Sequence, residues 1–374
     1  EGAEELTRIL NDFFSAMVGI VHDEGGDVLR FGGDAMTVFF PAGLWASLRA
    51  ASRMQEEALR FGAIGTRGGA FALGMKIGIS SGPLLLGTVG DSQVGRDYFA
   101  AGRCLDLAAD SEHHATRGQI ALCPACAHKL PQGAPGGKIL ADGFALIADP
   151  ANARVSLERS PESGPDAKRG AFRWPAVPGA AVLEAFLPPF ISDKAHASRG
   201  LLQAEHRRTT VLFLAFSGLD YEDDPDVVEK IRALYRQIAL VSAQHGGWVN
   251  KLDMGDKGSK AIVLFGAPQA LEHQEERACR AALALLADPR LRSSLTDLRI
   301  GITASPLFAA YVGCGERREY TVMGDGINMA ARLMANAHPW RVLASREVME
   351  RAGKALAFRE LDPIFVKGKA DAVL

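Results

Sequence analysis

The hydrophobic pattern of the chain predicts one order of elements that occurs twice. In each half, apolar residues at helical spacing predict a long helix, and a Gly-Gly pair after it predicts a turn. Two short β-rich runs and a second helix follow. The predicted helices are 5–21 and 44–59 in the first half and 226–244 and 271–286 in the second; the predicted strands are 27–31, 36–40, 248–252 and 261–265.

Each half continues with a long predicted hairpin and a third helix. We expect hairpin strands at 75–81 with 84–89 and at 298–304 with 307–312, and third helices at 103–114 and 326–335. The second half also opens with a strand at 209–216, whereas the first half starts inside its first helix, so we expect the first domain to lack this strand. The order predicts an α+β fold, an α/β sandwich in which each half forms a ferredoxin-like βαββαβ domain with helices on one face of a mixed sheet.

Short motifs recur at a nearly constant distance, which indicates two pseudo-symmetric copies of one domain. Lys76–Ser80 returns as Arg299–Thr303, 223 residues later, and Gly102 returns as Gly324, 222 residues later. A third pair is Gly25-Gly26-Asp27-Val28-Leu29-Arg30 and Gly246-Gly247-Trp248-Val249-Asn250-Lys251. We therefore expect a first domain at 1–160, a Pro-, Gly- and Ser-rich linker at 161–200 with a helical patch at 181–191, and a second domain at 201–374.

The composition is that of an ordinary globular protein and argues against several classes of partner. Of the 374 residues, 48% are hydrophobic and 23% are charged, and no apolar run reaches the ~18 residues of a membrane-spanning helix. The net charge of −2 gives no electrostatic reason to expect nucleic acid or an anionic membrane as a partner. The five scattered cysteines favour a reducing, cytoplasmic location, and the lone Cys123-Pro124-Ala125-Cys126 motif is typical of core or surface cysteines rather than of a zinc site.

Two motifs carry candidate chemistry. In the first half, Arg30-Phe31-Gly32-Gly33-Asp34-Ala35 places a carboxylate at the tip of a tight hairpin, and Mg²⁺ prefers one or two carboxylates together with phosphate oxygens. A plain turn aspartate is the alternative interpretation.

In the second half, the run from Glu319 to Arg332 predicts a strand, a glycine turn and a helix. Asn328 and Arg332 project from one face of that helix. An amide and a guanidinium there can bind a ribose and a phosphate; a solvated helix face is the alternative.

On these motifs, the chain resembles the paired catalytic domains of class III nucleotidyl cyclases, specifically the soluble, bicarbonate-responsive adenylyl cyclase type. The resemblance rests on the hairpins 30–40 and 76–90, on Asn250-Lys251 and on Glu319–Arg332, and it covers nearly the whole chain outside the linker. It implies two cyclase domains paired head to tail as an intramolecular pseudo-dimer. It further implies conversion of ATP to 3′,5′-cyclic AMP and pyrophosphate in the cleft between them.

The resemblance also implies a role for each matching residue of the second half. Lys251 and Thr321 match the pair that reads the base, and a Lys/Thr pair implies ATP rather than GTP. Asn328 matches the residue that orients the ribose. Arg332 matches the arginine that stabilises charge on the phosphate under attack.

Two divalent metal ions, Mg²⁺ or Mn²⁺, are implied as cofactors that activate the nucleophile and neutralise the leaving phosphates. Asp34 matches one of the two aspartates that hold them. The other belongs to the opening strand, where the second domain has Ala215, which cannot bind a metal.

A second, degenerate cleft is expected from the pseudo-symmetry. Phe99, Asp106 and Asp110 stand where the second half has Thr321, Asn328 and Arg332. The two carboxylates there would repel a triphosphate. In the bicarbonate-responsive relatives, this cleft binds the activator through a lysine and an arginine. The lysine position is Arg30 here and the arginine position is Ala109, so a small-molecule activator is expected without a commitment to bicarbonate.

A diguanylate cyclase and a nucleotide-sensing module are the two alternatives to an adenylyl cyclase. A diguanylate cyclase is suggested by the Gly-Gly-Asp hairpin, but Ala35 replaces the acidic residue that such enzymes need. A catalytically silent nucleotide-sensing module is favoured by the expected loss of the opening strand and disfavoured by the complete set Lys251, Thr321, Asn328 and Arg332.

Overall fold

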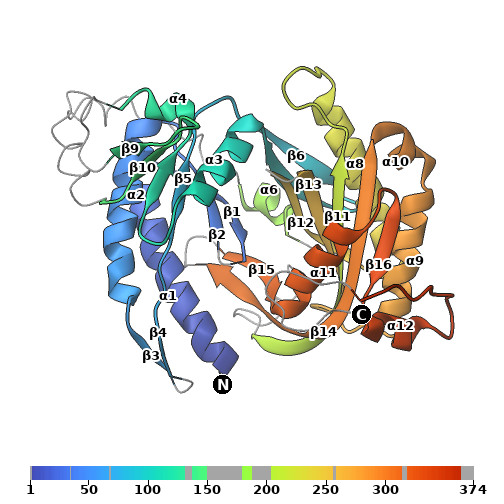
Figure 1. Cartoon of the computed structure of the whole chain (residues 1–374). Helices are drawn as coiled ribbons and strands as arrows, with labels where there is room; N and C mark the ends of the chain where they lie inside the picture. Colours follow the sequence, from blue (N-terminus) through green and yellow to red (C-terminus); the bar gives the residue numbers. More distant parts are fainter. Residues whose placement is uncertain are drawn as a thin grey trace. The chain divides into compact units, whose positions relative to one another are not determined.

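The computed structural model describes residues 2–33, 35–66, 69–130, 137–149, 179–187, 204–255, 258–313 and 318–363. The chain forms two compact units (Figure 1). Unit 1 comprises Glu1–Leu84, Gly102–Val177 and Val312–Glu319, and unit 2 comprises Leu85–Ala101, Pro178–Tyr311 and Tyr320–Leu374. Each half of the chain therefore contributes one segment to the unit that is built mainly from the other half.

Unit 2 contains the predicted α+β fold. Its strands are β11 (Glu205–Ser217), β12 (Trp248–Gly255), β13 (Gly258–Phe265), β14 (Asp297–Gly313), β15 (Arg318–Met323) and β16 (Arg341–Ala344). Their order is β12-β13-β11-β14-β15, with β16 parallel to β14. Its helices are α8 (Val227–Gln244), α9 (Gln274–Ala287), α10 (Pro289–Ser294), α11 (Asp325–Asn336) and α12 (Arg346–Ala352). The sequence β11-α8-β12-β13-α9-β14 is the expected βαββαβ unit.

Helices cover both faces of the unit 2 sheet, so the expectation of helices on one face was wrong. Leu212 and Leu214 of β11 pack in one apolar cluster with α8 and α9. The alternate residues Val211 and Phe213 pack in another with α11. Because successive side chains of a strand point to opposite faces, the continuous apolar run of β11 requires two covering layers.

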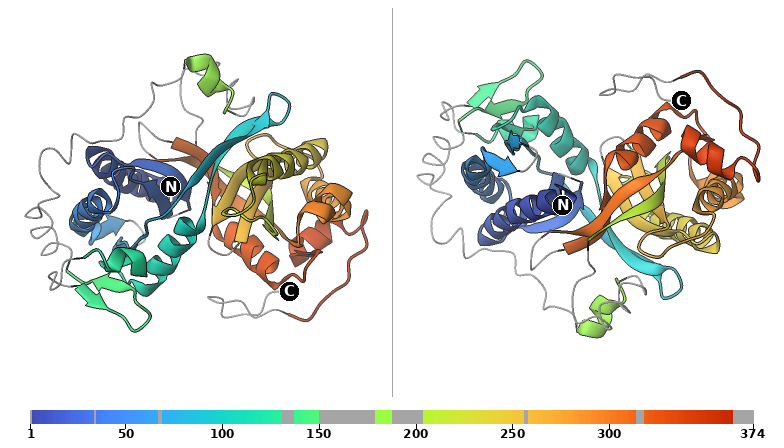
Figure 2. Two further views of the ribbon diagram at one scale, coloured as in Figure 1. Left: turned by 90° about the horizontal axis from the view of Figure 1, so that it is seen from above. Right: turned by 90° about the horizontal axis from the view of Figure 1, so that it is seen from below.

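The segment of the first half in unit 2 is the hairpin of β6 (Leu85–Asp91) and β7 (Gly95–Ala101). Figure 2 shows this cyan hairpin alongside α8. Arg232 Nε donates to the Thr88 carbonyl at 3.1 Å, and Arg236 Nε donates to Asp91 Oδ2 at 3.0 Å. The pKa of the Asp91 carboxyl is lowered, chiefly by the Gln93 backbone N–H and also by Arg236.

Unit 1 is built from the first half. Its helices are α1 (Gly2–Asp23), α2 (Leu44–Ala58), the short 3₁₀ helix η1 (Leu59–Phe61), α3 (Arg103–His114) and α4 (Pro124–Ala127). Its strands are β1 (Asp27–Gly32) with β2 (Ala35–Phe39), β3 (Ile64–Thr66) with β4 (Gly69–Phe71), and a sheet ordered β5-β8-β10-β9 (Ile77–Ile79, Ile120–Leu122, Ala145–Ile147 and Gly137–Ile139). A short helix of unit 2, α6 (Ala180–Glu184), confirms part of the helical patch in the predicted linker.

The predicted long hairpins are wrong in both halves. In the second half, 298–304 and 307–312 form one continuous strand, because β11 pairs with β14 along its whole length and Pro306 lies opposite Arg208 without ending the ladder. In the first half, β5 pairs in parallel with β8, and β6 pairs with β7. Gly82-Pro83 separates β5 from β6 there, so the two adjacent runs never pair.

The Gly-Gly turns are confirmed and have one physical cause in both halves. Gly25 and Gly246 end α1 and α8 with φ of 78° and 83°, a left-handed conformation that favours glycine. The N–H of Gly26 donates to the Val21 carbonyl and that of Gly247 to the Ser242 carbonyl, each at 2.9 Å. These bonds complete the helix ends and turn the chain into β1 and β12.

Candidate functional site

A β-bulge in β12 positions the first two candidate residues. Val249 pairs with Val263 and Lys251 pairs with Ile262, so Asn250 is an extra residue in its strand. Lys251 is buried, with 8% of its surface exposed. The bulge therefore carries a cationic side chain at a largely buried position of the sheet.

Asn250 connects the bulge to β15. Its Nδ2 donates to the Tyr320 carbonyl at 2.9 Å, and its Oδ1 accepts from the Thr321 hydroxyl at 3.4 Å. Thr321 is buried, with 8% exposed. The bulge therefore brings Lys251 and Thr321, 70 residues apart in sequence, into one neighbourhood.

Aromatic side chains of β12, β14 and β15 pack against one another. The Tyr320 ring lies 6.3 Å from that of Trp248 and 5.7 Å from that of Tyr311, between centroids. Burial raises the pKa of both tyrosine hydroxyls, so they remain protonated at neutral pH. An apolar surrounding strengthens each polar contact that a ligand makes there.

Helix α11 is anchored closely to β14. Gly324 precedes the helix with φ of 143°, which favours glycine. The Thr303 hydroxyl donates to the Gly326 carbonyl at 2.8 Å, and a Cβ on Gly326 would lie 2.1 Å from Ser305 Oγ. The first turn therefore has a fixed position relative to the strand.

Asn328 and Arg332 lie on this anchored helix. Asn328 is exposed and Arg332 is half-buried. The Nη1 atom of Arg332 is buried and has no hydrogen-bond partner among the residues that the structure describes. A buried donor without a partner costs free energy, so an anionic oxygen from a ligand would stabilise it.

The predicted site residues of the first half are distributed over both units. Arg30 lies in β1, and Asp106, Ala109 and Asp110 lie on α3, all in unit 1. Phe99 is fully buried in the apolar core of unit 2, with Val89 and α8. Asp34 lies outside the described residues.

The described residues do not by themselves fit a metal ion. They include no group of three or more His, Cys, Asp or Glu side chains that could hold one. Metal binding through Asp34 stays a prediction.

The cysteine motif belongs to the core of unit 1, as the sequence indicates. Cys123 and Cys126 are both fully buried in the cluster around β8. The hydrogen bond from Cys126 lowers the pKa of the Cys123 thiol to about 5, with help from backbone N–H groups, whereas the pKa of Cys126 is raised by the same bond and by burial.

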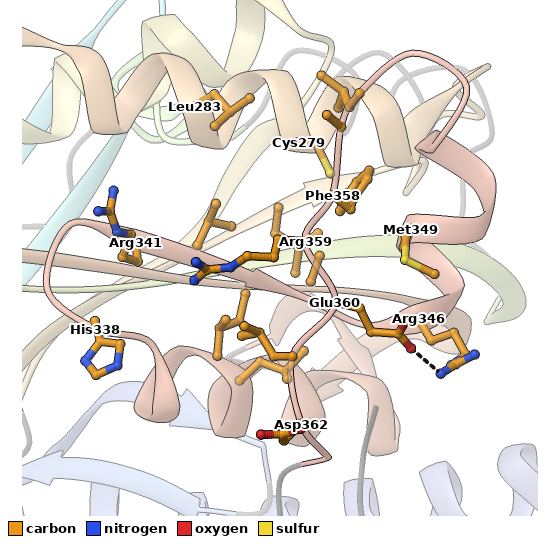
Figure 3. Close-up of a pocket in the computed structure, with 18 residues that line it drawn as sticks. Cys279, Leu283, His338, Arg341, Arg346, Met349, Phe358, Arg359, Glu360 and Asp362 are labelled. Atoms are coloured by element: carbon orange, nitrogen blue, oxygen red, sulfur yellow. Dashed lines mark hydrogen bonds and ion pairs between the residues drawn. The ribbon is translucent and has the colours of Figure 1, made fainter.

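A cavity of about 340 Å³ in unit 2 lies elsewhere (Figure 3). Leu333 of α11, β16, α12 and the segment 356–362 line it, and the Arg346–Glu360 ion pair of 2.9 Å closes one side. None of Lys251, Thr321, Asn328 and Arg332 lines this cavity.

Comparison with known proteins identifies the second half. Residues 203–374 match the family model described as the adenylate and guanylate cyclase catalytic domain. This part of the chain therefore resembles the catalytic domains of class III nucleotidyl cyclases in sequence.

Among the curated proteins that match the chain are several described only as uncharacterized proteins. One from Mycobacterium tuberculosis is 34% identical over 172 residues, which cover 44% of this chain and 31% of that protein. A second from Mycobacterium bovis is 32% identical over 172 residues, with the same shares of the two chains. The chain thus spans about a third of the length of these relatives.

Solved cyclase structures resemble part of the chain. The adenylyl cyclase CyaB from P. aeruginosa is 21% identical and covers 46% of this chain and 93% of its own, with a TM-score of 0.42. The guanylyl cyclase Cya2 is 23% identical and covers 46% of this chain and 91% of its own, with a TM-score of 0.42. In the described part of the chain, no helix is long and apolar enough to cross a membrane.

Sequence reasoning missed two residues that organise the cyclase domain. Asn250 was noted only as a neighbour of Lys251, and Thr303 only as part of a repeat. The sequence signal for Thr303 is its match to Ser80 in the repeat. In the structure, the Thr303 hydroxyl donates to the Gly326 carbonyl and the Ser80 hydroxyl donates to the Cys104 carbonyl, each in the first turn of the following helix. The bulge that gives Asn250 its place has no local sequence signature.

Proposed function

We propose that the protein is an adenylyl cyclase that converts ATP to 3′,5′-cyclic AMP and pyrophosphate. The observation that supports this most is the placement of the buried Lys251 and Thr321 on either side of the half-buried Asn250, which precedes Lys251 and hydrogen-bonds to Thr321. Arg332 has a buried nitrogen with no hydrogen-bond partner in the described part of the chain, and it adds a place for an anion.

The base preference follows from donors and acceptors. Adenine presents an amino group that donates and a neighbouring ring nitrogen that accepts. The Lys251 ammonium donates to the ring nitrogen, and the Thr321 oxygen accepts from the amino group. Guanine reverses both polarities on that edge, so it would face each of the two groups with the wrong polarity, at a cost of 10- to 1,000-fold in preference, on the order of 1–4 kcal/mol.

The remaining residues orient and stabilise. Asn328, at the exposed start of α11, holds the ribose hydroxyls so that the 3′-oxygen faces the α-phosphorus. Arg332, one helical turn later, donates to the α-phosphate oxygens as negative charge builds up and pyrophosphate leaves. Two divalent cations, Mg²⁺ or Mn²⁺, would be held with Asp34 as one ligand and would neutralise the charge of the leaving phosphates.

The proposed arrangement is an intramolecular pseudo-dimer of the two halves. Arg30, Phe99, Asp106, Ala109 and Asp110 are the proposed residues of the degenerate cleft, which would hold a small-molecule activator rather than ATP. The two carboxylates there are the basis for that choice.

Product analysis tests the function. The purified protein is incubated with ATP or GTP and Mg²⁺ or Mn²⁺, and cyclic AMP, cyclic GMP and pyrophosphate are quantified. We expect cyclic AMP with equimolar pyrophosphate, little cyclic GMP, and loss of product in Arg332→Ala. Nucleotide binding without any cyclic product would favour the nucleotide-sensing alternative, and cyclic GMP as the main product would overturn the proposed base preference.

A further inference from the structure

Resting on the proposed function, we infer that Asn250 is a specificity-determining positioning residue: it fixes the Thr321 hydroxyl as a hydrogen-bond acceptor toward the base. Asn250 itself needs no contact with the nucleotide in this role. It acts by accepting the hydrogen bond that the Thr321 hydroxyl donates.

The first step is the orientation of the amide. An asparagine carries a donor end and an acceptor end, which are told apart by the groups they face. The Tyr320 carbonyl can only accept, and it lies 2.9 Å from Nδ2 of Asn250. The amide nitrogen is therefore assigned to β15, and Oδ1 is left to face Thr321.

The second step is the orientation of the hydroxyl. A threonine hydroxyl has one proton and two lone pairs, and it rotates toward the best acceptor. The Thr321 oxygen lies 3.4 Å from Oδ1 of Asn250, which can only accept. The proton is directed to Asn250, so the lone pairs face the remaining directions.

The third step is the consequence for the base. An oxygen that presents only lone pairs accepts a hydrogen bond from the amino group of adenine, and it repels the carbonyl oxygen of guanine. A freely rotating hydroxyl would suit either base, because it can donate or accept. Discrimination at Thr321 thus depends on the amide of Asn250.

The bulge makes this arrangement possible. Asn250 is the extra residue between Val249 and Lys251, which keep their pairing with β13. The first half has a register shift at the corresponding place, between Val28 and Arg30, but the residue there is Leu29. A leucine cannot orient a hydroxyl, so the backbone device occurs twice and the amide only once.

The test measures nucleotide preference in a double-mutant cycle. The variants are Asn250→Leu, which installs the residue of the first half at similar volume, Thr321→Val, and both together. The readouts are the ATP:GTP ratio of kcat/KM, the ratio of dissociation constants for non-hydrolysable α,β-methylene ATP and GTP, and Tm. Asn336→Leu is the matched control, since Asn336 also bonds to a backbone carbonyl, that of Arg332, without contacting Thr321.

We expect Asn250→Leu to lower the ATP:GTP ratio about 10-fold, the effect of one oriented hydrogen bond. In the Thr321→Val background the same change should alter the ratio less than 2-fold, because the hydroxyl that Asn250 orients is absent. Asn336→Leu should leave the ratio unchanged.

The outcomes separate this inference from the proposed function. An Asn250→Leu protein with lowered Tm and an unchanged ratio would show a structural crosslink only and overturn the inference. Equal effects of Asn250→Leu with and without Thr321 would also overturn it. If no cyclic nucleotide forms, the proposed function fails, and the binding ratio of the two analogues still decides the role of Asn250. Failure to bind either analogue would overturn both.

Discussion

The two halves of the chain share a scaffold but differ at nearly every proposed site position. Gly78 and Gly301 are a matched pair: a Cβ on either would meet a carbonyl of the following helix at 2.1 Å. The backbone N–H of Cys123 and that of Ser345 donate to the carbonyls of Ile79 and Ile302, each at 2.9 Å. These shared features all fix backbone positions.

The differences lie in side chains that would face a ligand. The second half has Asn250, Thr321 and Arg332, where the first half has Leu29, Phe99 and Asp110. The Phe99 ring fills apolar core instead of offering a hydroxyl. The comparison teaches that one backbone framework can carry a polar set of side chains, the one proposed to bind a nucleotide, or a set without those groups, and that the framework alone does not predict activity.

The largest effect on kcat is expected at Arg332, whose twin position in the first half is the oppositely charged Asp110. Arg332→Ala should lower kcat by roughly 100- to 1,000-fold with little change in KM, because the interaction develops in the transition state. Steady-state kinetics of cyclic AMP formation provide the measurement. The twin change Asp110→Ala should alter kcat less than about 3-fold. A near-normal kcat with a greatly raised KM for Arg332→Ala would make this residue a ground-state phosphate clamp.

A second prediction concerns the shared glycines. Gly301→Ala places a methyl group against the Ala330 carbonyl and the Met334 backbone nitrogen, at 2.1 and 2.5 Å, and Gly78→Ala does the same at Ala108 and Glu112. Each change should destabilise the protein by about 1–3 kcal/mol, the usual cost of overpacking.

Only Gly301→Ala should also reduce catalysis, because the helix it displaces carries Asn328 and Arg332. Urea unfolding and cyclic AMP assays on both variants measure the two effects. Equal loss of activity in Gly78→Ala would show that the first half contributes to catalysis as much as the second.

A third prediction uses the paired hydroxyls. Thr303→Val and Ser80→Ala each remove a hydrogen bond to the first turn of the following helix. We expect about 0.5–1.5 kcal/mol of destabilisation in each, measured by thermal unfolding. A loss in Thr303→Val with none in Ser80→Ala would show that the two anchors are not equivalent.

The smallest effect is a pH dependence confined to the first half. His114 contacts the Asp110 carbonyl and Asp142 Oδ2, each at 2.8 Å, and these contacts raise its pKa from the ordinary 6.5, the Asp110 carbonyl having the largest influence. The protonated imidazole therefore stabilises the fold below that ordinary value, and the stabilisation is lost as pH rises through the raised pKa.

The matching residue of the second half is Asn336, which makes the same bond to the carbonyl four residues earlier. His114→Asn should remove the part of the pH dependence of Tm that His114 contributes, which we expect to be less than about 2 °C for so exposed a contact. Tm measured across this pH range in both proteins is the check; an unchanged slope in the variant would assign the dependence to another group.

Much of the fold was predictable because its signals are local. Helical periodicity and the preceding glycine predict a helix at 103–114, and α3 spans Arg103–His114. The turns after α1 and α8 are predicted by their Gly-Gly pairs. The hairpins were missed because strand pairing depends on distant partners: Ser305-Pro306 has the composition of a turn, yet thirteen residues of β11 pair across it. The base-reading pair could be proposed from a family resemblance, whereas the orienting role of Asn250 required the bulge and the Tyr320 carbonyl to be seen together.

The most direct test of the central claim, that the second half reads adenine through Lys251 and Thr321, is a reversal of base preference. Lys251→Glu combined with Thr321→Cys replaces a donor by an acceptor and an oriented acceptor by a weak, adaptable thiol. The measured quantity is the ATP:GTP ratio of kcat/KM in the wild-type protein and in this variant. We predict a ratio above 10 in the wild type and a fall of at least about 100-fold in the variant, toward GTP. An ATP:GTP ratio that stays unchanged in an active double variant would contradict the account.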